Sequence, residues 1–307
     1  MVKYGIDNEL AKLVKQKAPS NIYLYPIVNI VMKLSTCASD DKVTVKRYIT
    51  PGYENRKLTT FLIEPKKNSD ILPCIVFYHG GGLLLKASRA HYQIAKWYAE
   101  MANCKVVLTD YRLLPKNKYP VPVEDCYCTY KWILHCADRL EINKDKIIVA
   151  GDSAGGNLAA AVTLMLWDRV QISPLGAMLI YPVVDRRMKT DSMKKFTDTP
   201  VWDTARTKMF WNAYLGNQGP KQIHYASPIE AKSLEYFPNV YMEVAEFDCL
   251  HDEGIAFAER LQAEGVLTEL HEVKGACHGY ETILKSRIVE ESMQRRIRWI
   301  QSVFNKQ

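Results

Sequence analysis

The most informative stretch of this 307-residue chain reads Lys146-Ile147-Ile148-Val149-Ala150-Gly151-Asp152-Ser153-Ala154-Gly155-Gly156. Its first half is a short apolar run, which is typical of a strand buried on both faces. Its second half is rich in glycine, and a helix of small residues is expected from Asn157 to about Asp168. The pattern predicts a sharp turn that joins a buried strand to a helix, with Ser153 at the turn.

Residues 151–155 match the motif G-x-S-x-G, in which the serine is a nucleophile. Such a serine takes strained backbone angles, and small neighbours two positions away let strand and helix approach closely. The following helix then points its N-terminus at the reaction centre. Phosphate binding is the alternative use of such a turn, but this stretch lacks the lysine of a P-loop and the G-x-G-x-x-G spacing. We therefore predict that Ser153 is the nucleophile.

Predicted strands and helices alternate on both sides of this turn. The strands are expected at 42–50, 58–64, 73–78, 105–109, 146–150, 176–181, 239–245 and 267–273. The helices are expected at 89–102, 123–140, 157–168, 252–264 and 286–304. This alternation predicts an α/β fold with a mainly parallel central sheet flanked by helices.

Three segments stand outside the alternation. Residues 7–17 predict an amphipathic helix whose apolar face is Leu10, Leu13 and Val14. The apolar residues 21–34 predict a helix or a piece of a lid, since they include a proline and a lysine and are too few to span a bilayer. Residues 185–225 are rich in Lys, Asp, Trp and Thr and predict an inserted helical lid.

A glycine-rich stretch upstream predicts hydrogen-bond donors for the reaction. An ester attacked by serine passes through a tetrahedral oxyanion, and backbone N–H groups must already point at that oxygen. His79-Gly80-Gly81-Gly82 follows the buried run 73–78, where a fold with this serine turn supplies such donors. We predict that the donors are the N–H groups of Gly81, Gly82 and Ala154; the alternative is a merely flexible turn.

The base and the acid are expected downstream, because the chain order in such folds is Ser, then Asp or Glu, then His. The downstream histidines are His224, His251, His271 and His278. We predict His278, which lies in a loop just after the last predicted strand. Asp248 is predicted as the orienting acid because it ends the preceding strand, with Asp252 as the main rival. Asp152, beside the nucleophile, is expected to be structural.

Composition and charge exclude several classes of protein. Hydrophobic residues make up 48% and charged residues 24%, as in soluble globular proteins. The net charge of +7 comes from scattered lysines and arginines, so we interpret it as favouring solubility and expect no nucleic-acid partner. The first residues are too polar for a signal peptide. We therefore expect a cytoplasmic protein without stable membrane insertion.

The eight cysteines are expected to be free thiols in that reducing compartment. Cys126, Cys128, His135 and Cys136 lie close together in the sequence. Their spacing does not match the usual zinc pairs, however, and the segment predicts a helix. We expect neither a metal nor a cofactor.

The chain resembles the hormone-sensitive-lipase-like family of α/β-hydrolases, which includes bacterial acetyl esterases and carboxylesterases. Motifs between about residues 73 and 283 carry the resemblance: His79-Gly80-Gly81-Gly82, Asp110-Tyr111-Arg112-Leu113-Leu114-Pro115, Gly151-Asp152-Ser153-Ala154-Gly155-Gly156-Asn157, Tyr181-Pro182, Ala245-Glu246-Phe247-Asp248, Asp252-Glu253-Gly254 and His278-Gly279. It departs from the family at Leu83, where an aromatic residue is common, and at Cys249, where a proline is common. Neither departure removes a catalytic group, but the first leaves the shape of the acyl pocket open.

The resemblance implies one α/β-hydrolase domain over residues 1–307, with a cap formed by about residues 1–40 and the insert 185–225. It also implies a Ser-Asp-His triad, an oxyanion hole of two or three donors, and cofactor-free hydrolysis of short acyl esters of small molecules, often by a homodimer. Aromatic lid residues are candidates for lining the site: Trp202, Phe210, Trp211 and Tyr214. The sequence leaves open which of them face inward.

Other functions remain open at this stage. An amidase, a peptidase or an acyltransferase would use the same triad, and a non-catalytic small-molecule-binding protein could share the fold, although His278 speaks against it. A lipase that acts at membranes is a further alternative, since the N-terminal helices could form an apolar cap surface, but lid packing explains that segment equally well. Cys249 and Cys277 flank the predicted acid and base. We hypothesise that thiol reagents inhibit the protein by disturbing these loops; the alternative is that both thiols are buried and inert.

Overall fold

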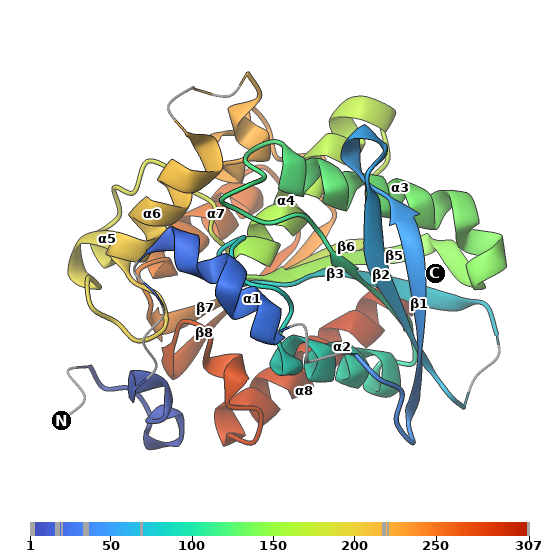
Figure 1. The fold of residues 1–307 in the computed structure, drawn as a ribbon, viewed down its shortest axis with the longest axis horizontal. Coiled ribbons are helices and arrows are strands. Elements are labelled where there is room, and N and C mark those ends of the chain that lie inside the picture. The colour runs from blue at the N-terminus through green and yellow to red at the C-terminus, as the bar shows by residue number, and fades with distance from the viewer. Residues whose placement is uncertain are drawn as a thin grey trace.

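The fold is built on one twisted sheet with helices on both faces (Figure 1). The computed structural model describes residues 4–15, 19, 21–32, 37–67, 70–216, 219 and 221–305. The strands are β1 (Val43–Pro51), β2 (Lys57–Pro65), β3 (Leu72–Tyr78), β4 (Lys105–Asp110), β5 (Ile142–Asp152), β6 (Gly176–Ile180), β7 (Asn239–Phe247) and β8 (Thr268–Cys277). Their order in the sheet is β1-β2-β4-β3-β5-β6-β7-β8.

Strands β3 to β8 are all parallel to one another, whereas β1 pairs with β2 and β2 with β4 in antiparallel fashion. The central strands are apolar because both of their faces are covered; every residue of β6 is buried. The predicted mainly parallel α/β sheet is therefore confirmed.

The helices divide between the two faces of the sheet (Figure 1). They are α1 (Tyr25–Met32), α2 (Arg89–Met101), α3 (Val121–Leu140), α4 (Ala154–Val170), α5 (Asp191–Lys195), α6 (Thr204–Leu215), α7 (His251–Ala263) and α8 (Arg287–Phe304). Helices α2 and α8 pack with one set of β3 side chains, Ile75 and Phe77, while α3, α4 and α7 pack on the side of Cys74 and Val76. Alternate residues of one strand thus belong to opposite halves of the core.

The prediction of one helix over residues 7–17 is wrong. The chain forms two separate 3₁₀ turns, Asn8–Leu10 and Leu13–Lys15, and residues 16 and 17 lie outside the described part. Leu10 and Leu13 are buried, whereas Val14 is exposed. Leu10 belongs to the first turn and Leu13 to the second, and both side chains join the core cluster on the side of α2 and α8.

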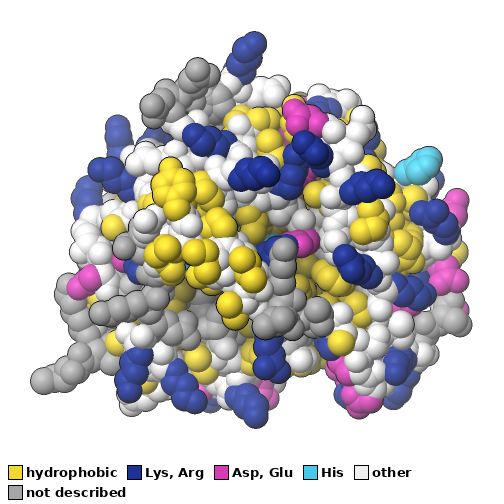
Figure 2. Space-filling model, in the orientation of Figure 1, with side chains coloured by type: hydrophobic (Ala, Val, Ile, Leu, Met, Phe, Trp, Pro, Cys, Tyr) yellow, Lys and Arg dark blue, Asp and Glu magenta, His cyan; other side chains and the backbone are white. Residues whose placement is uncertain are grey.

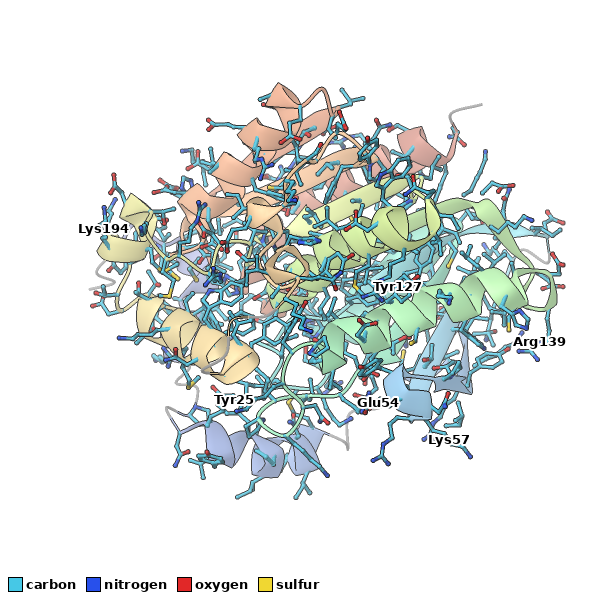
Figure 3. All side chains as sticks on the ribbon, turned by 90° about the horizontal axis from the view of Figure 1, so that it is seen from above. Tyr25, Glu54, Lys57, Tyr127, Arg139 and Lys194 are labelled. Carbon is cyan, nitrogen blue, oxygen red and sulfur yellow. The ribbon has the colours of Figure 1, made fainter. Side chains whose placement is uncertain are left out.

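The insert 185–225 contains α5, α6 and a 3₁₀ turn, Ile223–Tyr225. Helix α1 lies beside α6 in both Figure 1 and Figure 3, and Tyr25 shares a core cluster with Trp202 and Phe210. Two segments far apart in the sequence therefore meet on one side of the molecule. Within the described ranges, no helix combines the length and the apolar character that a bilayer-spanning segment requires.

Candidate active site

Ser153 lies between β5 and α4, and its backbone is strained. Its φ of 54° and ψ of −121° form a combination that residues with a Cβ rarely adopt. The amide of Ser153 donates to the carbonyl of Ile180, at the end of β6, over 2.8 Å. The turn thereby fixes the serine hydroxyl at the carboxyl end of the sheet.

The glycines beside Ser153 are explained by steric crowding. A Cβ on Gly151 would overlap the carbonyl of Gly155, and a Cβ on Gly155 would overlap the carbonyl of Tyr78 on β3. Helix α4 begins at Ala154, three residues earlier than its expected start. The N–H groups of its first turn have no intrahelical acceptor, so the helix presents free donors next to Ser153.

Three of the predicted site residues form one hydrogen-bonded chain. The hydroxyl oxygen of Ser153 lies 2.7 Å from Nε2 of His278, and Nδ1 of His278 lies 2.6 Å from Oδ2 of Asp248. All three side chains are buried. A carboxylate only accepts hydrogen bonds, so Nδ1 carries the hydrogen and Nε2 of the neutral ring is free to accept the serine proton.

The rival acid lies elsewhere. Asp252 is at the start of α7, where it accepts the amide hydrogen of Ser192 over 2.7 Å and contacts His251. The carboxylate of Asp248 is held from its other side, since its Oδ1 accepts the amide hydrogen of Leu250 over 3.0 Å. The three other downstream histidines each pair with a carboxylate outside this chain of bonds; they are His224, His251 and His271.

The glycine loop after β3 lies against the serine turn. Gly81 and Gly82 have φ values of 104° and 63°, which favour glycine. The amide of Gly80 donates to Oδ1 of Asp152 over 2.9 Å. Gly81, Gly82 and Ser153 line the same cavity, and Ala154 is the next residue of the chain. The structure thus brings together the loops that carry the three predicted oxyanion donors.

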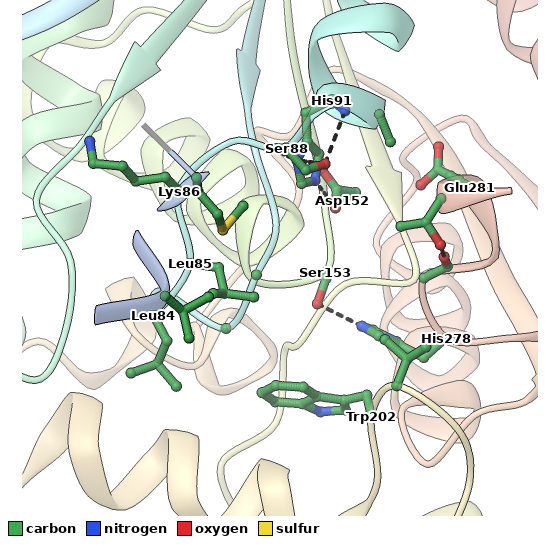
Figure 4. A pocket seen from close by; sticks show the side chains of 18 of the residues that line it. Leu84, Leu85, Lys86, Ser88, His91, Asp152, Ser153, Trp202, His278 and Glu281 are labelled. Atoms are coloured by element: carbon green, nitrogen blue, oxygen red, sulfur yellow. Dashed lines mark hydrogen bonds and ion pairs between the residues drawn. The ribbon is translucent and has the colours of Figure 1, made fainter. Parts of the chain in front are cut away.

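That cavity has a volume of about 340 Å³ and is lined mainly by apolar side chains. Figure 4 places the hydroxyl of Ser153 and the ring of His278 beside the indole of Trp202, with Leu84 and Leu85 across from them. Helix α1 contributes further lining through Tyr25, Val28 and Met32. An apolar cavity with a few convergent polar groups is the usual form of a small-molecule site.

Comparison with known families identifies the chain. The model of a family described by its alpha/beta hydrolase fold matches residues 75–282, which is more than half of the chain. This chain belongs to the alpha/beta hydrolase family. The matched range contains the glycine loop, the serine turn, Asp248 and His278.

Relatives of this alpha/beta hydrolase carry esterase names. "Carboxylesterase NlhH" of Mycobacterium tuberculosis is 33% identical over 69% of this chain and 67% of its own length. An arylesterase of Saccharolobus solfataricus is 31% identical over 80% of each chain. The solved structure "Bacterial Heroin Esterase" has a TM-score of 0.89 and 28% identity, with 98% of this chain and 99% of the other covered. The first three curated relatives are longer, since the chain covers 66%, 65% and 55% of them.

Sequence reasoning missed one partner of the serine turn in this alpha/beta hydrolase. Oδ2 of Asp152 lies 3.2 Å from Nε2 of His91, at the start of α2 (Figure 4). Burial favours the neutral form of Asp152, but the neighbouring imidazole outweighs it and lowers the pKa of this carboxyl. Conversely, Asp152 outweighs the burial of His91 and raises the pKa of its ring. Asp152 thus links α2 to the glycine loop.

A second missed residue fixes helix α1. Nδ2 of Asn29 donates to the carbonyl of Leu84 over 2.7 Å, and the amide of Lys86 donates to Oδ1 of Asn29 over 2.9 Å. Asn29 is buried, and these two bonds attach α1 to the chain directly after the glycine loop. Its only sequence signal is one polar residue in an apolar run, which did not reveal its partner.

Of the four aromatic lid candidates, the structure brings Trp202 to the cavity. Its indole N–H donates to the hydroxyl of Thr207 over 2.9 Å, and a Cβ on Gly82 would lie 2.8 Å from the ring. Phe210, Trp211 and Tyr214 are buried in the core around α6 and are not among the residues that line the cavity. Leu83, where the chain departs from the family pattern, is buried next to the glycine loop and does not line the cavity either.

The two cysteines next to the triad are buried completely. Burial raises the pKa of Cys277 to about 12 and that of Cys249 well above its usual range. These properties favour inert thiols over the hypothesis of inhibition by thiol reagents. Within the described residues, no cluster of three or more His, Cys, Asp or Glu side chains is arranged to hold a metal ion.

Proposed function

We propose that this protein is a serine carboxylesterase that hydrolyses short acyl esters through an acyl-enzyme. The observation that carries the proposal is the bonded chain Ser153–His278–Asp248 at the wall of an apolar cavity. The esterase names of the relatives support the same reaction class. Ser153 is the proposed nucleophile, His278 the base and Asp248 the orienting acid.

The reaction then has two half-reactions. Ser153 attacks the ester carbonyl carbon while Nε2 of His278 takes the hydroxyl proton, and the tetrahedral intermediate collapses to an acyl-enzyme as His278 returns this proton to the leaving alcohol. Water attacks the acyl-enzyme by the same steps and releases the acid. Asp248 keeps the hydrogen on Nδ1 and stabilises the imidazolium that forms in each half-reaction.

The N–H groups of Gly81, Gly82 and Ala154 are the proposed donors to the oxyanion. Ala154 is suited because it opens α4, where N–H groups have no intrahelical acceptor. Gly81 and Gly82 are suited because they line the cavity beside Ser153 and present no side chain to a substrate. Donors fixed before the reaction stabilise the developing charge without reorganisation.

The preference for short acyl chains rests on the cavity. Its volume of about 340 Å³ is near the lower end for small-molecule sites. Residues on two distant segments limit it: Tyr25, Val28 and Met32 on α1, and Val201 and Trp202 in the insert. We propose that about residues 1–40 and 185–225 form a cap. The lining residues support this for the α1 region and the insert, whereas Ile6, Leu10 and Leu13 pack in the core cluster on the side of α2 and α8. Residues 1–3, 16–18, 20 and 33–36 of the first segment lie outside the described part.

The test is hydrolysis of p-nitrophenyl esters from acetyl to decanoyl by the wild type and by Ser153→Ala. We expect the highest kcat/KM at the short end of the series and loss of essentially all turnover in the variant. Wild-type turnover by Ser153→Ala would refute the triad, and a maximum at decanoyl would refute the chain-length assignment. Matched amide substrates, which we expect to be cleaved far more slowly, separate an esterase from an amidase.

A further inference from the structure

Helix α1 carries an apolar face that the fold does not use. Ile27, Ile30 and Val31 are between 61% and 65% exposed, and Tyr23 and Leu24 just before the helix are exposed as well. Figure 2 shows hydrophobic side chains gathered on this side of the molecule, where α1 lies in Figure 1. Clustered exposed apolar side chains mark an interaction surface.

The opposite face of α1 is fully occupied. Tyr25, Val28 and Met32 line the cavity, and Asn29 is bonded to the backbone of Leu84 and Lys86. Helical spacing places positions 25, 28, 29 and 32 together and positions 27, 30 and 31 on the other side. The packing of the helix therefore explains its inner residues only, and the outer row needs another explanation.

Basic side chains adjoin the outer row. An open depression of about 600 Å³ is lined by Tyr23, Pro26 and Ile30 on one side and by the segment 110–118 on the other. Its charged lining residues are Lys86, Asp110, Arg112, Lys116 and Lys118. The one acid among them pairs with Lys86. Arg112 is also paired, with Asp125.

Lys116 and Lys118 supply the remaining positive charge of the depression. Both are exposed, and neither forms an ion pair with another described residue. The whole chain carries a net charge of +7. The surface around α1 thus combines an exposed apolar row with two lysines that have no ion-pair partner among the described residues. This combination complements a membrane surface that carries negative charge.

We propose that α1 binds this protein to an anionic phospholipid surface. Ile27, Ile30 and Val31 would enter the boundary between headgroups and acyl chains, as the apolar face of an interfacial helix does. Lys116 and Lys118 would lie against the lipid phosphates, where each lysine strengthens binding and salt weakens it. Membrane binding of this kind is peripheral, needs no spanning helix, and does not depend on ester hydrolysis.

The test is co-sedimentation with phosphatidylcholine vesicles with and without phosphatidylserine. We expect binding to the anionic vesicles only, with loss of binding when salt is raised from about 0.1 M to about 1 M. We expect binding to the anionic vesicles to weaken at least about tenfold in each of two variants. One is Ile27→Ser/Ile30→Ser/Val31→Ser, and the other is Lys116→Glu/Lys118→Glu. Ser153→Ala should bind like the wild type, which separates this proposal from the enzymatic one.

A matched control replaces three equally exposed residues on other parts of the surface. Ile49, Ile71 and Leu267 are 58% to 68% exposed, so Ile49→Ser/Ile71→Ser/Leu267→Ser removes a similar apolar area. It should bind like the wild type. The α1 variant should keep hydrolysis of a soluble short ester, because its three residues do not line the cavity.

Three results would overturn the proposal. The first is wild-type protein that binds neither vesicle, or both equally. The second is an α1 variant that binds as the wild type does. The third is wild-type protein that is dimeric by light scattering and becomes monomeric in the α1 variant, since the apolar row would then be an interface between two copies.

Discussion

Replacing Asp248 by asparagine should lower turnover by several orders of magnitude while leaving the fold in place. The carboxylate is completely buried, accepts the Nδ1 hydrogen of His278 at 2.6 Å and also accepts the amide hydrogen of Leu250. An asparagine of the same shape can donate to Nδ1, which moves the ring hydrogen to Nε2. Nε2 then faces the hydroxyl of Ser153 at 2.7 Å as a donor and cannot take its proton.

Loss of the correct tautomer in such a triad costs a factor of about 10³ to 10⁴ in kcat, which is about 4 to 5.5 kcal/mol of barrier. The assay is p-nitrophenyl acetate hydrolysis across pH, with urea unfolding as the check on folding. Asp252→Asn is the matched control, since Asp252 contacts Ser192 and His251 instead. Asp252→Asn should keep kcat within about threefold of the wild type, because its contacts lie outside the triad and their loss affects stability more than catalysis. Collapse of turnover in Asp252→Asn with near-normal turnover in Asp248→Asn would refute the assignment of the acid.

Three further changes test the surroundings of the triad. Trp202→Ala should raise the ratio of decanoyl to acetyl ester turnover about tenfold, because the indole limits the cavity; an unchanged chain-length profile would count against that role. Cys249 and Cys277 should resist iodoacetamide in the native protein and react only on unfolding, as peptide mass mapping can determine; rapid native labelling with loss of activity would restore the inhibition hypothesis. His91 has a pKa raised above 6.5 by Asp152, so its contribution to stability is complete below pH 6.5 and is lost as pH rises through the raised pKa. Urea unfolding should show that the free energy of unfolding declines with rising pH in the wild type and changes less with pH in His91→Gln. Equal pH dependence in the two proteins would show that the His91–Asp152 pair does not contribute to stability.

The central sheet was predictable because buried parallel strands are short apolar runs that helical segments separate. The runs at 73–78 and 146–150 are of this kind, and both lie in observed strands. The 3₁₀ turns near the N-terminus were not predictable, since two leucines three residues apart suit an α-helix equally well. Both leucines are buried in the folded protein, as either type of helix would allow.

Proximity of the candidate triad residues could be inferred because a motif fixes Ser153 and strand ends fix the other two. His91 and Asn29 could not be identified in this way. Their partners Asp152 and Leu84 lie 61 and 55 residues away in the sequence, and no local pattern records those contacts. Residues that act through hydrogen bonds to distant parts of the chain leave only an isolated polar residue in the sequence.

The two bonds of Asn29 have a consequence for engineering. The same short helix forms part of the cavity wall and holds the backbone that follows Gly81 and Gly82. A graft that replaces α1 with the corresponding helix of a relative would therefore alter the fit of the substrate and the aim of the glycine loop together. Residues 21–32 and 83–86 are best exchanged as one unit in chimeras, with the asparagine and its two backbone partners transferred from a single parent.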